Sequence, residues 1–167
     1  MIKLDIPNKK IESTIKEYPY QEMIILQSNV SAANGNLHFG QQLVLDALLA
    51  DYGKELDLKA DIVKTLNGTA LRKAFVFVAA YFTSNQANKI GVEITNSKTL
   101  YFHAIIGEKH YHFEVYLEDK LESVVNIFEN NKQVYNNSGS IYDLVGDKNK
   151  ETINYRYSHG ISLATAT

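Results

Sequence analysis

From residue 88 onward, apolar and polar positions alternate along the chain. The segments "KIGVEIT", "SKTLYFHAII" and "KHYHFEVYL" each place an apolar residue at every second position. A period of two is typical of a β-strand that buries one face and exposes the other. The short link "GEKH" between the second and third segments indicates a hairpin. The pattern therefore predicts an antiparallel meander.

The alternation also predicts a register for the central hairpin. With Glu108 and Lys109 at its tip, Ile106 faces Tyr111 and the pairing continues to Leu100 opposite Leu117. A shift of one residue would expose the whole apolar set to water, so we expect the faces to be strongly specified. The predicted buried face carries Leu100, Phe102, Ala104, Ile106, Tyr111, Phe113, Val115 and Leu117.

Residues 119–135 allow two interpretations. Leu121, Val124, Val125 and Phe128 fit one face of a helix. The same segment also contains two short strand patterns, "SVVNIF" and "QVY", separated by "ENNK". This arrangement is typical of a hairpin with an Asn-Asn turn. We favour the hairpin, because Val, Ile and Phe dominate the segment. A helical turn capped by Ser140 and a last strand in "TINYRY" complete the prediction.

The first half of the chain shows mainly helical spacing. Four helices are predicted. The first contains Ile11 and Ile15 and ends before Pro19, and the second spans 41–52 and stops at Gly53. The third begins after Asp57 as its N-cap, and the fourth begins after Thr69 as its N-cap. Two segments compete with this pattern. "EMIILQSNV" reads as a buried strand with helix as the alternative, and "FVFVAAYF" in the last helix is also compatible with a strand. "KLDIP" predicts a short first strand.

These elements predict an α+β fold. An N-terminal helical layer would pack on one face of a C-terminal antiparallel meander, within a single domain spanning 1–167. The length and the 45% hydrophobic content suit one domain with a real core.

Charge and composition narrow the function classes. The net charge is −2 and no stretch is strongly basic, so we expect no nucleic-acid partner. The longest apolar run, Ala74–Phe82, is too short to cross a bilayer, so no membrane association is expected. The absence of cysteine excludes thiolate sites and disulfides. The absence of cysteine, together with an N-terminus that lacks the apolar region of a signal peptide, favours a cytoplasmic location.

The polar face of the predicted hairpin carries the candidate chemistry. In the predicted register His103 lies opposite Glu114 and diagonal to His112, at separations of about 5 Å and about 7–8 Å between Cβ atoms. Two imidazoles and a carboxylate could then share a zinc or iron ion with an open fourth position, or His110 could fill that position. This interpretation predicts a metal-dependent, hydrolase-like enzyme.

The same face is also typical of a binding surface, or simply of a strand that meets water. Tyrosine is enriched at protein interfaces, and the chain has eleven tyrosines. Since no complete catalytic set is found, our leading hypothesis is a non-enzymatic binding protein that needs no cofactor and holds a protein partner or its own copy. Its predicted binding face is Tyr101, His103, His112, Glu114 and Tyr116.

A small-molecule pocket between the helices and the sheet is a third possibility. Phe75, Phe82, Phe102 and Phe113 would line it. We prefer to interpret these four rings as ordinary core.

Overall fold

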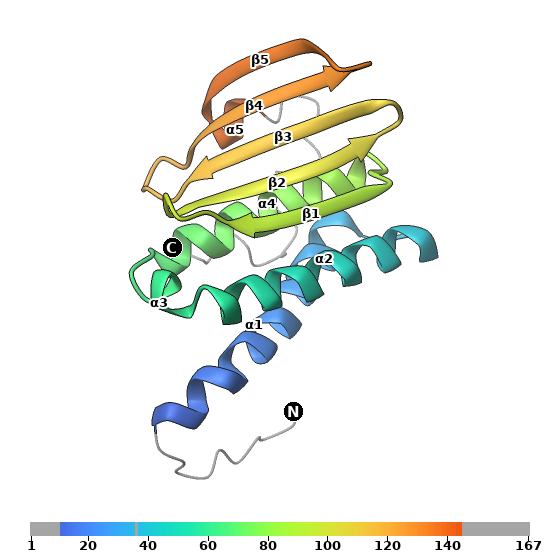
Figure 1. The fold of residues 1–167 in the computed structure, drawn as a ribbon. Helices are drawn as coiled ribbons and strands as arrows, with labels where there is room; N and C mark the ends of the chain where they lie inside the picture. The colour runs from blue at the N-terminus through green and yellow to red at the C-terminus, as the bar shows by residue number, and fades with distance from the viewer. Residues whose placement is uncertain (1–10, 36, 145–167) are drawn as a thin grey trace.

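The computed structural model of the protein describes residues 11–35 and 37–144. Helices come first and a five-stranded antiparallel sheet follows, which confirms the α+β prediction (Figure 1). In chain order the elements are α1 (Ile11–Asn34), α2 (Phe39–Leu58), α3 (Ala60–Val63), α4 (Gly68–Ser84), β1 (Lys89–Ile94), β2 (Thr99–Ile106), β3 (Lys109–Tyr116), β4 (Glu122–Glu129), β5 (Lys132–Ser140) and α5 (Ile141–Leu144).

The sheet is a simple meander in which the strands lie in the order β1-β2-β3-β4-β5. Helix α4 lies against one face of it (Figure 1), and α1 packs on both α2 and α4. We call the helix-covered face the inner face and the opposite one the outer face. The predicted alternation is present. The inner face buries Leu100, Phe102, Ala104, Phe113 and Val115, and Ile105 lies on the outer face beside His103.

The predicted register of the β2–β3 hairpin was wrong by two residues. Phe102 pairs with Phe113, and Ile106 pairs with Lys109, so the loop consists of Gly107 and Glu108. Gly107 has φ +60°, which suits the first central position of a type II′ turn, where glycine is favoured. A shift of two residues keeps every side chain on its predicted face but changes its partner across the hairpin.

Residues 122–140 form the predicted hairpin, and the helical alternative for 119–135 was wrong. Asn130 and Asn131 form its two-residue turn, with φ values of 50° and 60°. Asparagine tolerates this left-handed conformation better than most residues, which fits a type I′ turn. A β-bulge interrupts the pairing between Ile127 and Phe128.

The predicted strand "EMIILQSNV" was also wrong, because one continuous helix runs through it and through Pro19. Leu26, Val30 and Ala33 are buried, and their spacing of four and three residues follows one side of a helix. Ile24 and Ile25, which suggested a strand, are each about half exposed. Packing against α2 and α4 therefore overrides the local β-propensity.

Helix α2 does not stop at Gly53 but continues to Leu58, so a cap at Asp57 was wrong too. A side chain at position 53 would meet the Met23 sulfur, since an ideal Cβ there lies 2.2 Å from the Met23 Sδ atom. Glycine serves the close approach of α1 and α2 at this point. The helix predicted after Asp57 shortens to α3.

Helix α4 is the central buried helix, and the competing strand interpretation was wrong. It begins at Gly68, earlier than a Thr69 cap would allow, because the Asn67 side chain accepts a hydrogen bond of 3.1 Å from the Ala70 amide. The four phenylalanines proposed as pocket lining are at most 1% exposed, and the Phe82 ring contacts those of Phe102 and Phe113. They form the core of the domain.

The helical turn after Ser140 is present as α5. The strands predicted in "KLDIP" and "TINYRY" lie outside the described residues. No helix among the described residues combines the length and the apolar character that crossing a bilayer requires.

Candidate functional site

The outer face of the sheet carries every residue predicted for the binding face. No helix of the described residues covers it, and the side chains of those predicted residues are half-buried or exposed. Its central row runs across five strands in the order Gly91, His103, His112, Asn126 and Asn136. An ideal Cβ at Gly91 would meet nothing within 4 Å, so His103 has open space on its β1 side.

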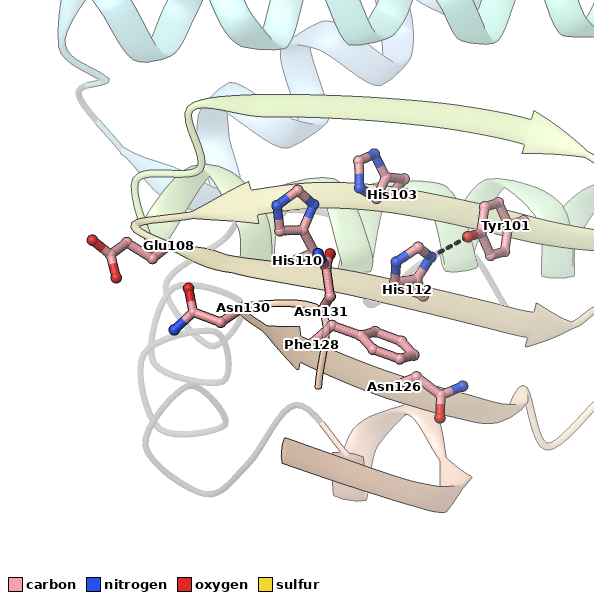
Figure 2. Close-up of a pocket in the computed structure, with 9 residues that line it drawn as sticks. All are labelled: Tyr101, His103, Glu108, His110, His112, Asn126, Phe128, Asn130 and Asn131. Atoms are coloured by element: carbon pink, nitrogen blue, oxygen red, sulfur yellow. Dashed lines mark hydrogen bonds between the residues drawn. The ribbon is translucent and has the colours of Figure 1, made fainter. Parts of the chain in front are cut away.

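Three histidines meet on this face (Figure 2). His103 and His112 are directly paired, and their ring centroids lie 5.0 Å apart. The His110 ring stacks on that of His103 at 5.7 Å with an interplanar angle of 30°. The predicted pairing of His103 with Glu114 was therefore wrong, because the register places His112 there instead.

The neighbours of His112 hold its ring from two sides. The Tyr101 hydroxyl forms a hydrogen bond with His112 Nδ1, drawn as the dashed line in Figure 2. On the β4 side, the Phe128 ring meets the imidazole edge to face, with centroids 5.2 Å apart. This geometry is favourable for aromatic pairs and fixes the imidazole between two larger rings.

The rings form the floor of an open hollow of about 760 Å³. Tyr101, His103, His110, His112, Asn126 and Phe128 line its floor. The turn residues Glu108, Asn130 and Asn131 close one end, because the β2–β3 and β4–β5 turns lie at the same end of the sheet (Figure 2). The hollow therefore offers aromatic surface below and polar side chains at its rim.

Electrostatics favour the uncharged form of two of the histidines. Burial lowers the pKa of His103, and the nearby His112, His110 and Lys89 lower it further. Burial and His110 likewise lower the pKa of His112. Both imidazoles are thus mainly neutral at pH 7, where each offers one hydrogen-bond donor and one acceptor.

The phenol in the same cluster also keeps its proton. Burial raises the pKa of Tyr101, and the carboxylates of Glu114 and Glu93 raise it further. These two carboxylates lie opposite Tyr101 on the neighbouring strands.

The remaining residues predicted for the site lie away from the hollow. Glu114 pairs with Tyr101, and its Oε1 atom accepts a hydrogen bond of 2.7 Å from the Thr99 hydroxyl. Tyr116 is 41% exposed at the end of β3. Within the described part of the chain, no group of three or more His, Cys, Asp or Glu side chains is placed to hold a metal ion.

Five lining residues were not predicted from the sequence: Glu108, Asn126, Phe128, Asn130 and Asn131. The alternation in "SVVNIF" contains the signal for two of them, because it puts Asn126 and Phe128 on the same face as Val124. This alternation identifies the face of Asn126 and Phe128 only if residues 119–135 are taken as a hairpin instead of a helix.

Comparisons with family models, with curated proteins and with solved structures found no match to this chain.

Proposed function

We propose that this chain is a non-enzymatic binding protein that holds a protein partner on the outer face of its sheet. One observation carries the proposal: the helices of residues 11–35 and 37–144 cover only the inner face, while the outer face holds a cluster of interacting rings around an open hollow. The surface is centred on Tyr101, His103 and His112 and extends to Glu114 and Tyr116.

The ring cluster suits recognition because its side chains are already ordered. Tyr101 is tied to His112, and His112 is packed against Phe128, so little side-chain entropy remains to be lost on binding. Aromatic groups held in this way are typical anchors at protein interfaces. The half-buried rings also leave apolar area that a partner can cover.

The polar groups of the hollow give such a surface specificity. The turn asparagines offer amide donors and acceptors, Asn126 offers its amide N–H groups, and the neutral His103 ring offers one donor and one acceptor. His112, whose Nδ1 is bonded to Tyr101, offers its other ring nitrogen. A partner that fails to pair with them would leave polar groups buried and unsatisfied, which costs about 1–3 kcal/mol for each group. The hollow therefore selects among partners more sharply than a smooth apolar patch would.

Alanine substitutions on and off the outer face test the proposal. The full chain, immobilised, is used to capture partners from a lysate, and each captured protein is then purified and titrated against Tyr116→Ala and Phe128→Ala. Phe39→Ala is the matched control, because Phe39 is 81% exposed on α2, away from the sheet. We expect each outer-face variant to weaken binding by about tenfold or more, as truncation of an interface anchor does.

Circular dichroism should show that all three variants remain folded. Binding that is unchanged by both outer-face substitutions, or weakened as much by Phe39→Ala, would refute the proposal.

A further inference from the structure

The two edges of the sheet differ in how far they are covered. Helix α2 runs beside β1. The Glu55 side chain of α2 accepts a hydrogen bond of 3.2 Å from the Ile94 amide, and Lys59 Nζ donates one of 2.9 Å to Asn96 Oδ1. The β1 edge is thus partly satisfied from within the chain.

Among the described residues, no helix other than α5, which continues the strand, donates a hydrogen bond to the β5 edge or accepts one from it, and the one side-chain bond to its backbone comes from Asn137 of the same strand. Strand β5 pairs with β4 on one side and with no other described strand. Its residues 132–138 are exposed, and Gly139 and Ser140 are half-buried. An edge strand presents unpaired N–H and C=O groups that can bind a further strand.

The usual protections against edge pairing are nearly absent from β5. Natural edges carry lysine, proline, inward-pointing charges or bulges that prevent association. Between Gln133 and Tyr142 there is neither a charged residue nor a proline. The single bulge lies near the Val134 end, and residues 135–140 pair regularly with 122–127. Six consecutive residues therefore form the edge. Alternate ones point their N–H and C=O groups away from β4, and among these the Ser138 N–H already donates a hydrogen bond of 2.9 Å to Asn137 Oδ1.

We propose that β5 pairs antiparallel with β5 of a second copy of this chain, about a two-fold axis perpendicular to the sheet. This proposal does not depend on the proposed function of the outer face. Two five-stranded sheets would join into one continuous sheet of ten strands. The axis keeps both outer faces on the same side, so the two hollows would face a common partner.

The charge pattern favours a second copy as the occupant. Antiparallel self-pairing places like residues near one another, which is unfavourable for a charged strand but not for this uncharged one. Lys132 begins the strand and Asp143 lies just beyond its end. The antiparallel arrangement therefore brings each lysine toward the oppositely charged end of the other copy. Two-fold dimers are also the commonest oligomers.

Sedimentation velocity of the full chain tests the pairing. A six-residue edge contact is small, so we expect a dimer that forms reversibly as the concentration rises from about 1 µM to about 300 µM. Ser138→Lys and Ser138→Glu each place like charges near the axis and should weaken dimerisation about tenfold or more. Ser97→Lys, on the exposed β1–β2 turn, is the matched control and should leave the dimer unchanged.

A mixing experiment adds a result that loss of folding cannot imitate. Equal amounts of Ser138→Lys and Ser138→Glu should restore dimers, because opposite charges then meet across the axis. A wild-type chain that stays monomeric over the whole range would overturn the proposal. So would a dimer that survives Ser138→Lys but dissociates with Tyr116→Ala, which would assign self-association to the outer face instead.

Discussion

His103 lies directly opposite His112 on the outer face, with 5.0 Å between the ring centroids. Both rings are partly removed from water, which opposes their charged forms and lowers both pKa values, and the nearby His112 lowers the pKa of His103 further by charge repulsion. The pair is therefore stable as two neutral rings, and protonation is opposed by the fold.

Stability should decrease on mild acidification. The pKa values of His103 and His112 are lower in the folded protein than the ordinary value of 6.5. Below about pH 6.5 the unfolded chain binds more protons than the folded one. The free energy of unfolding therefore decreases as the pH is lowered from about 6.5, until the pH is below the pKa values of the folded protein. Urea denaturation at a series of pH values from about 7.5 to about 5 measures the effect.

The double variant His103→Gln/His112→Gln should reduce that slope, while a His38→Gln control should retain it. NMR titration of the imidazoles gives a second measure. His112→Gln should move the pKa of His103 back toward its ordinary value, because His112 is one of the groups that lower it. An unchanged His103 titration would contradict this account.

The observed register also bears on metal binding. Glu114 is paired with Tyr101 and bonded to Thr99 instead of facing His103. Elemental analysis of the purified protein should therefore find zinc and iron at well below one equivalent, and His112→Ala should leave the amount unchanged. One equivalent of metal that disappears with His112→Ala would instead support the enzyme hypothesis.

The strands were predictable because alternation is a local property with a period of two. It assigned His103, His112 and Tyr101 to one face without knowledge of any partner strand. The register depended on the φ angle at Gly107, which the amino-acid sequence does not reveal. This angle decided whether His103 pairs across the hairpin with Glu114 or with His112. The face of the sheet on which each side chain lies was therefore predicted correctly, while its partner on the neighbouring strand was not.

The helical errors have a different origin. Ile24 and Ile25 favour a strand by propensity, yet the partners that make the segment helical lie far along the chain in α2 and α4. Interactions between distant segments decide such cases, and a single sequence does not show them.

The β4–β5 turn gives a test of backbone conformation. Asn131 has φ 60°, in a region that costs an ordinary L-residue about 1–2 kcal/mol. Asn131→Gly should therefore increase the free energy of unfolding slightly, and Asn131→Ala should decrease it by about 1 kcal/mol. Chemical denaturation measures both. Because Asn131 also lines the hollow, the folded-state spectra of both variants should be compared first. Equal stability of the glycine and alanine variants would contradict a strained turn.

The contact between Gly53 and Met23 is the sharpest test of the helical layer. Alanine is favoured over glycine inside a helix by about 1 kcal/mol, so Gly53→Ala alone would be expected to stabilise α2. Its new Cβ would lie 2.2 Å from the Met23 sulfur, however, and the methionine would have to move. In a Met23→Ala background that obstacle is gone. The double-mutant cycle should therefore show that Gly53→Ala is more favourable in the Met23→Ala background than in the wild-type chain, by about 0.5 kcal/mol, since the flexible end of the methionine can shift at low cost. Additive effects of the two substitutions would mean that the helices do not approach closely at this point.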